Sequence, residues 1–265
     1  MFIISNLVDL RPALIVYKRH KYYMSEIPRC KTDIQGLDQI LNGGIPEEHT
    51  IVVSGTSGAG KTTLTTQFLY NGAKNHDDKG IYFTLEEPAR NIVETSKNFN
   101  MDFENDEGVA GKVKFHEELN LMREGSGGDV FEPDRFIDAF KRQIEQYDPD
   151  RVVLDSITKF AMVFDSSPLR REKVSEIAQF LREQECTACL LAEIPYTGGE
   201  RQVSKYQIVE FVGDGVILLG NERTDSSRTR TLEVFKMRRT DHSSDIHPLK
   251  ITGNGIVTYP NQTAF

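Results

Sequence analysis

The chain has 265 residues, of which 38% are hydrophobic, so it is long enough to bury a core and suits one α/β domain. Its formal net charge of -8 argues against a protein whose main surface binds nucleic acid or an anionic membrane, but not against a local basic patch. Three cysteines, an odd number, indicate a reducing compartment and not a disulfide scaffold. We therefore expect a cytoplasmic protein.

The first 23 residues differ in pattern from the rest of the chain. Two apolar stretches, 2–4 and 14–17, are separated by charged residues and Pro12, and the basic cluster 18–21 follows them instead of preceding them. This order is wrong for a secretion signal, and the apolar span is too short to cross a membrane. We expect residues 1–23 to be an extension outside the core and residues 24–265 to form the domain. The alternative for the extension is an interfacial anchor.

The first predicted elements of the domain surround a glycine-rich segment. Residues 32–41 predict a capped short helix, and residues 42–46 predict a turn that ends it. Residues 50–54 then predict a short buried strand, and residues 62–73 predict a helix.

The glycine-rich segment between that strand and helix fits the phosphate-loop pattern at every fixed position. It consists of Gly55, Thr56, Ser57, Gly58, Ala59, Gly60, Lys61 and Thr62, with Thr63 next on the helix. Its glycines let successive N–H groups point inward, and the helix adds its positive dipole end, so the loop can cradle a polyphosphate. Lys61 is then expected to reach the β- and γ-phosphates, and Thr62 to bind Mg²⁺ through its hydroxyl. The alternative is a glycine-rich surface turn.

The later elements alternate between strands and helices and then become strands alone. Residues 80–85 predict a strand, and Pro88 opens the next helix. The remaining predictions are a strand at 112–115, a loop at 124–129, a helix at 133–147, a strand at 151–155, a helix at 168–184, and strands at 189–192, 208–219, 231–237 and 256–259. This order predicts a mostly parallel central sheet flanked by helices, with an antiparallel C-terminal extension.

Carboxylates follow two of these strands. Asp155 comes after four apolar residues, where a carboxylate can hold Mg²⁺ or its water; the alternative is a cap for the next helix. Glu86 and Glu87 follow the 80–85 strand, where one carboxylate could orient and deprotonate an attacking water. The alternative is a pair of helix-start charges. We expect Glu86 to be the base and Glu87 its partner.

Cys186 and Cys189 have a spacing seen in redox and metal sites. No second such pair occurs, and Cys189 begins an apolar run, so we expect both to be structural.

Several motifs together resemble the KaiC family of RecA-type ATPases. They are residues 33–38, 43–46, 55–62, 83–87, 152–156 and 235–242. The resemblance spans residues 27–260. It implies a RecA-like fold that binds ATP with Mg²⁺ and assembles into rings, usually hexamers, with nucleotide at the subunit interfaces. It also implies that Lys236, Arg238 and His242 reach the nucleotide of a neighbouring subunit; the alternative is an ordinary basic edge strand.

This sequence departs from the family at two places. Arg239 stands where many relatives have glycine, which is expected to alter the approach of that strand to its neighbour. Glu210 and Phe211 stand where the clock protein has its Ser-Thr phosphoacceptors, which excludes autophosphorylation at that place. Because the chain also has one ATPase domain and not two, no circadian function follows. Kinase activity towards another residue stays open.

Three functions are compatible with these features. The first is a slowly hydrolysing ring ATPase that regulates a protein partner through its nucleotide state. The second is a single-stranded DNA-binding recombination accessory protein, because the loop 196–206 carries Arg201 and Lys205 with Tyr196 and Tyr206. The third is a nucleotide-binding scaffold without turnover.

Overall fold

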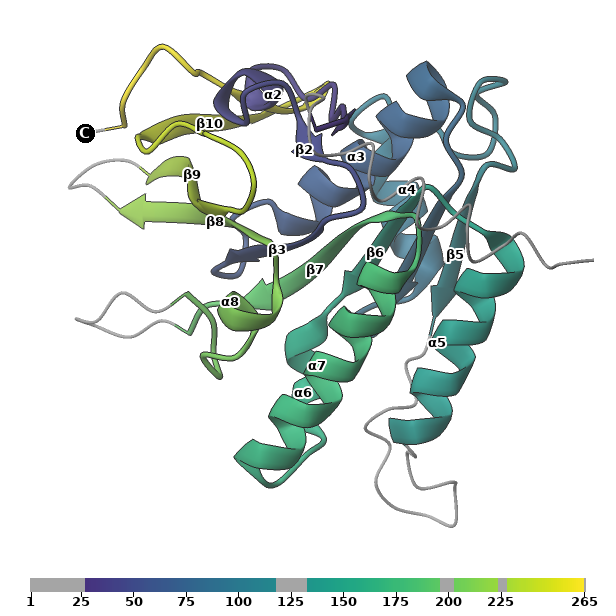
Figure 1. The fold of residues 1–265 in the computed structure, drawn as a ribbon. Helices are drawn as coiled ribbons and strands as arrows, with labels where there is room; N and C mark the ends of the chain where they lie inside the picture. Colours follow the sequence, from purple (N-terminus) through teal and green to yellow (C-terminus); the bar gives the residue numbers. More distant parts are fainter. Residues whose placement is uncertain (1–26, 118–132, 196–202, 224–227, 265) are drawn as a thin grey trace, which may run out of the picture.

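The computed structural model describes residues 27–117, 133–195, 203–223 and 228–264 (Figure 1). The strands of its large sheet are β3 (Thr50–Gly55), β4 (Gly80–Thr84), β5 (Val113–Glu117), β6 (Arg151–Asp155), β7 (Thr187–Glu193), β8 (Gly215–Arg223), β9 (Arg228–Met237), β10 (Ile246–Thr252) and β11 (Gly255–Thr258). A small ribbon is made of β1 (Arg29–Cys30) and β2 (Ile45–Pro46). The helices are α2 (Leu37–Ile40), α3 (Lys61–His76), α4 (Ala89–Lys97), α5 (Pro133–Tyr147), α6 (Ile157–Met162), α7 (Ser167–Glu183) and α8 (Val209–Val212).

The large sheet has the strand order β11-β10-β9-β8-β3-β7-β6-β4-β5. From β8 to β5 every neighbouring pair is parallel, whereas β9, β10 and β11 are added beyond β8 with every neighbouring pair antiparallel. The predicted mostly parallel sheet with an antiparallel C-terminal extension is therefore confirmed.

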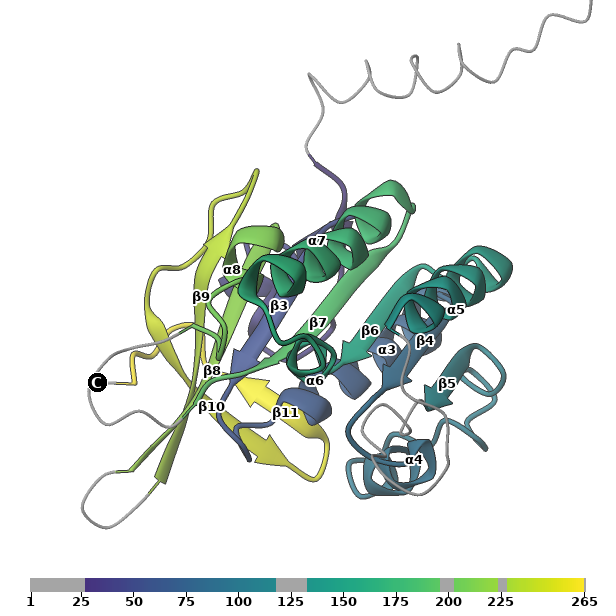
Figure 2. The ribbon, with the colours of Figure 1, turned by 90° about the horizontal axis from the view of Figure 1, so that it is seen from below.

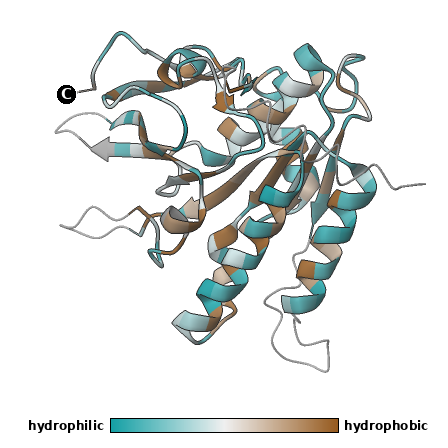
Figure 3. Cartoon of the chain, viewed as in Figure 1, coloured by the Kyte–Doolittle hydropathy of each residue, from teal (hydrophilic) through white to brown (hydrophobic). Residues whose placement is uncertain are grey.

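Helices cover both faces of the sheet because its strands are apolar on both sides. One hydrophobic cluster joins Ile51 and Val53 of β3 to α2, α3 and α4, and a second joins Val52 to α5, α6, α7 and α8. Figure 2 shows these helical layers on either side of the strands, and Figure 3 shows the apolar residues concentrated on the strands and the inner helix faces. None of the described helices combines the length and apolar character that crossing a membrane requires.

A buried arginine ties the first residue of β6 to α3. The Arg151 Nε donates to Asp78 Oδ2 at 2.6 Å, and its Nη1 donates to the Phe68 carbonyl at 2.8 Å. The guanidinium lies so close to Gly72 of α3 that a Cβ there would be 2.2 Å from Nε. Glycine at position 72 therefore allows the charge to be buried with its partners.

One predicted strand is wrong in its first half. Residues 208–219 were expected to be a single strand, but residues 209–212 form α8, and β8 begins only at Gly215. Val212 of α8 and Val216 and Leu218 of β8 belong to the same hydrophobic cluster, so the apolar run is shared by two elements of different type. Periodicity alone cannot separate a buried strand from a buried helical turn.

Three features of the fold were not predicted from the sequence, and two predictions concern residues outside the described ranges. The short helix α6 and the strand β10 were not predicted, nor was the β1-β2 ribbon. The predicted boundary at Met24 and the predicted loop at 124–129 lie outside the described residues, so both stay predictions.

Candidate functional site

The phosphate loop lies between the carboxyl end of β3 and the start of α3. Gly60 precedes α3 with φ of 107°, a left-handed conformation that favours glycine. The Lys61 Nζ donates to the carbonyl oxygens of Gly55 at 2.9 Å and of Thr56 at 3.2 Å. The ammonium group therefore curls back over the start of the loop, within reach of an anion held by the loop.

Two hydroxyl groups converge on Asp155 at the end of β6. The Thr62 Oγ1 donates to Asp155 Oδ2 at 3.1 Å, and the Tyr82 hydroxyl donates to the same oxygen at 2.6 Å. The structure thus brings together the two predicted metal-binding residues. A hydroxyl and a carboxylate are oxygen donors of the kind that Mg²⁺ takes, usually with waters and phosphate oxygens in addition.

The charges of this site are strongly affected by burial. Desolvation raises the pKa of Asp155 to about 6, although the hydrogen bond from Tyr82 lowers it. Desolvation also lowers the pKa of Lys61, against the opposing effects of Glu193, Asp155 and Glu86. An additional cation beside Asp155 would favour the ionised carboxylate and so offset the desolvation that burial imposes on its charge.

We predict that Asp155→Asn stabilises the ligand-free protein at pH 8. Because the pKa of Asp155 is raised in the folded state, ionisation of this carboxyl group destabilises the fold. This destabilisation is absent below pH 3.8, the ordinary pKa, and complete above about pH 6. Removing the charge should gain about 1–3 kcal/mol at pH 8, less at pH 5. Urea unfolding at both pH values measures this. An Asp155→Asn variant that is less stable at pH 8 would contradict it.

The two glutamates after β4 have different surroundings. The Glu86 Oε1 accepts a hydrogen bond from Ser156 Oγ at 2.7 Å, and its Oε2 lies 3.6 Å from the Lys159 Nζ. Ser156 also caps α6 by accepting from the Lys159 backbone N–H. By contrast, the described part of the chain places no hydrogen-bond or ion-pair partner on the Glu87 carboxylate. Glu87 is held through its backbone, where its carbonyl oxygen accepts a hydrogen bond from Thr84 Oγ1. Glu86 is therefore the oriented carboxylate of the pair.

Three residues of the site were missed by the sequence analysis. Glu193 ends β7 and acts electrostatically on Lys61. The end-of-strand argument used for Asp155 would have found it. Tyr82 contacts Asp155 only because β4 and β6 are neighbours, and Arg230 of β9 donates from Nε to the Gly58 carbonyl at 3.2 Å. Neither contact has a local signal in the sequence.

The predicted trans residues lie at the other end of the strands. Met237 of β9 pairs with Gly215, whereas Leu219 of the same β8 pairs with Gly55 of the phosphate loop. Gly215 and Leu219 are four positions apart in β8, which corresponds to about 13 Å. Lys236 donates to the Gly213 carbonyl, Arg238 pairs with Asp214 at 3.3 Å, and the His242 Nδ1 lies 2.8 Å from the Ser243 carbonyl. These residues therefore do not gather at the phosphate loop of their own chain.

The backbone at Arg239 has the conformation of a glycine position. Its φ is 61°, in the left-handed region that side chains disfavour. This explains physically why glycine suits the position. The arginine adopts the same turn at a cost of about 1 kcal/mol.

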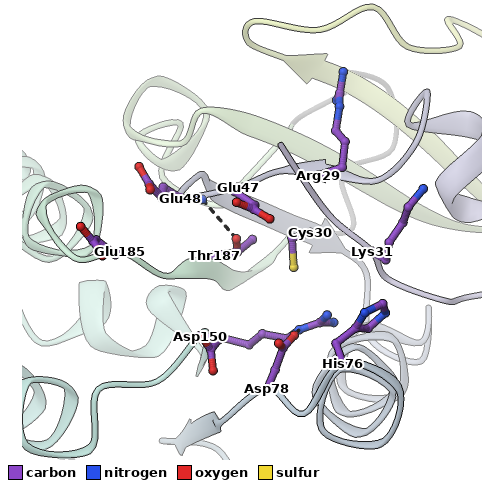
Figure 4. A pocket seen from close by; sticks show the side chains of 11 residues that line it. Arg29, Cys30, Lys31, Glu47, Glu48, His76, Asp78, Asp150, Glu185 and Thr187 are labelled. Atoms are coloured by element: carbon purple, nitrogen blue, oxygen red, sulfur yellow. Dashed lines mark hydrogen bonds and ion pairs between the residues drawn. The ribbon is translucent and has the colours of Figure 1, made fainter. Parts of the chain in front are cut away.

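Two cysteines and one hollow lie away from this site. Cys186 and Cys189 belong to the clusters on opposite faces of the sheet, so they cannot hold one metal ion together. A hollow of about 300 Å³ lies beside the first residues of β6 and β7, at the end opposite to the phosphate loop. Cys30, Asp78 and His76 are among the residues that line it (Figure 4). Within the described residues, no group of three or more potential metal ligands gathers.

The predicted DNA-contacting loop is only partly described. Tyr196 and Arg201 lie outside the described residues. The Arg170 guanidinium lies 4.1 Å from the centre of the Tyr206 ring, and the Lys205 Nζ lies 5.6 Å from it. Because Arg170 already covers one face of Tyr206, that face is not open for stacking on a base.

Comparison with known proteins supports a family assignment. The sequence model of the family described as "ATPase: KaiC" matches residues 30–263. The chain is 33% identical to the circadian clock oscillator protein KaiC of Picosynechococcus sp., over 88% of this chain and 45% of that protein. It is 32% identical to the protein of the same name from Acaryochloris marina, over 92% and 46%. The chain thus spans about half the length of these curated relatives.

A solved structure matches over its whole length. It is a KaiC-like protein from the hyperthermophilic archaeon Pyrococcus horikoshii, with a TM-score of 0.76 and 33% identity. The match covers 89% of this chain and 100% of that one.

Proposed function

The chain belongs to the KaiC family of ATPases, and on that basis we propose that it binds ATP with Mg²⁺ at the carboxyl edge of its sheet and hydrolyses it slowly. The observation that carries the proposal is the convergence of three segments there. Lys61 and Thr62 come from the phosphate loop, Asp155 from β6, and Glu86 from the end of β4. The domain that does this is residues 24–265.

Each residue of the site has a distinct role in the proposed reaction. The loop 55–60 binds the phosphates through its backbone N–H groups. Lys61 exchanges its two carbonyl partners for β- and γ-phosphate oxygens, and Thr62 and Asp155 hold Mg²⁺ or its waters. When bound, Mg²⁺ neutralises the charge that develops on the phosphate oxygens. Glu86, oriented by Ser156 and Lys159, accepts the proton of the attacking water.

We further propose that the active site is completed by a second copy of the chain. The end of β9, which carries Lys236 and is followed by Arg238 and His242, lies about 13 Å along the strands from its own phosphate loop, a span that argues for contact with a neighbour's nucleotide. Subunits joined head to tail in this way close into a ring, which the family resemblance suggests is hexameric. The nucleotide state would then change subunit packing and so regulate a protein partner.

The experiment that tests hydrolysis compares Glu86→Gln with Glu87→Gln. We predict that Glu86→Gln lowers ATP turnover by about 10²–10³-fold, because it removes the base, while ATP binding is retained. Glu87→Gln should lower turnover by less than about tenfold, since Glu87 is not held towards the site. Steady-state phosphate release and nucleotide binding are measured on both variants.

The outcomes separate the alternatives. The reverse order of effects would make Glu87 the base. Wild-type turnover no higher than that of Lys61→Ala would favour the non-hydrolysing scaffold. Salt-sensitive binding of single-stranded DNA that is lost in a double Arg201→Ala, Lys205→Ala variant would favour the recombination function.

A further inference from the structure

Two exposed phenylalanines lie close to the Lys236 segment. The exposed large hydrophobic side chains among the described residues are Met162, Leu169, Phe211 and Phe235. Phe211 is 63% exposed and Phe235 is 48% exposed. A single exposed apolar residue needs no explanation, but a pair close to the proposed trans cations suits a contact surface.

Phe235 is exposed because β9 is irregular at this point. Val216 of β8 pairs with Lys236, and Ile217 pairs with Val234, so Phe235 is the additional residue of a β-bulge. The outer neighbour β10 pairs with β9 only from Arg230 to Glu233. The last four residues of β9, 234–237, therefore have no described strand on that side, and the bulge presents an aromatic ring at an open edge.

Phe211 lies on α8, and the residues that directly follow α8 contact the same part of β9. The Lys236 Nζ donates to the carbonyl of Gly213, two residues after Phe211, at 2.8 Å, and the Arg238 N–H donates to the carbonyl of Asp214 at 3.0 Å. These bonds hold the end of α8 against the end of β9, which lie side by side in Figure 2. Arg171 places its guanidinium 5.6 Å from the centre of the Phe211 ring. The aromatic rings are thus accompanied by cations.

The opposite end of the sheet carries several carboxylates, together with Lys61 and Lys159. The carboxylates of Glu86, Glu87, Glu193 and Asp155 follow or end the strands there. Bound nucleotide would add further negative charge. With its nucleotide bound, the carboxyl end of one chain would be negatively charged, whereas Lys236 and Arg238 lie beside the exposed rings at the other end, which suits head-to-tail contact between copies.

We propose that Phe211 and Phe235 form the apolar centre of the surface by which one copy of this chain holds the next. Their rings pack against the carboxyl edge of the neighbour, and Lys236 and Arg238 lie beside them facing its carboxylates and nucleotide. This inference rests on the assembly in the proposed function, and it assigns the binding energy to two residues that take no part in the chemistry. Buried aromatic rings at the centre of an interface, with charges around them, carry most of the affinity in such contacts.

The test measures assembly of the full chain without turnover. Sedimentation velocity is followed over a range of protein concentrations with Mg²⁺ and the non-hydrolysable analogue AMP-PNP, for wild type, Phe211→Ala, Phe235→Ala and the double variant. Each single change should raise the concentration at half assembly by at least about tenfold, and the double change by more. Leu169→Ala, which removes a comparably exposed apolar side chain from the first turn of α7, should leave it unchanged.

Folding and nucleotide binding are checked on the same samples. Circular dichroism and AMP-PNP binding by the dissociated variants should match wild type, since both rings are exposed and lie away from the phosphate loop. Variants that assemble at the wild-type concentration, an equal effect of Leu169→Ala, or a wild-type chain that never assembles would each overturn the inference. Assembly that depends on the two rings in a chain that turns over no ATP would support it and contradict only the proposed hydrolysis.

Discussion

Replacing Lys61 by alanine is expected to reduce ATP turnover by at least about 10²–10³-fold and to weaken ATP binding. Lys61 is the only cation within the loop sequence 55–62, and its ammonium group already lies over the loop start at 2.9 Å from the Gly55 carbonyl. Without it, the charge that develops on the phosphates is not neutralised from this side. Phosphate release with Mg²⁺ and nucleotide binding measure the two effects.

The loss of ATP turnover in Lys61→Ala should not come from unfolding of the protein. Because burial lowers the pKa of Lys61, the charged group is not a source of stability in the ligand-free protein, and thermal unfolding of Lys61→Ala should resemble wild type. Lys97→Ala is a matched control, since Lys97 pairs with Glu104 on the surface of α4 and lies outside the site. Wild-type turnover in Lys61→Ala would contradict the proposed site.

Arg238→Ala is expected to reduce turnover by about 10³-fold or more while each chain still binds ATP, because a cation supplied by a neighbour stabilises the transferring phosphoryl group. In its own chain Arg238 is 55% exposed and pairs with Asp214 at 3.3 Å. Such a surface pair contributes at most about 1 kcal/mol, so the side chain can leave it for a neighbour's nucleotide.

A mixing experiment decides whether Arg238 acts in trans. Lys61→Ala chains keep Arg238, and Arg238→Ala chains keep Lys61, so each variant alone has no complete interface. In an equal random mixture, about one quarter of head-to-tail interfaces combine an intact loop with an intact arginine. Turnover should therefore reappear on mixing. Two inactive variants that stay inactive together, while still assembling, would place Arg238 outside the neighbour's site.

Local patterns were sufficient for most of the central elements. The strands β3, β4 and β6 were predicted to within one residue at each end, because each is an apolar run bounded by turn residues or carboxylates. The helix α5 was predicted with its observed bounds, and its buried residues Phe136, Ile137, Phe140 and Ile144 have helical spacing. The strand prediction at 208–219 failed because burial on two sides hides the period that distinguishes a helical turn from a strand.

The sequence by itself determined the phosphate loop and the position of Asp155, Glu86 and Glu87 at strand ends, since both depend on residue types within a few positions of one another. The tertiary structure decided which of these side chains meet. The strand order places β6 beside β4 and β7 beside β3, which brings Tyr82 to Asp155 and Glu193 towards Lys61. It also places the end of β9 away from its own loop and beside α8. Strand order and register depend on packing between segments that are distant in sequence, so no local pattern specifies them.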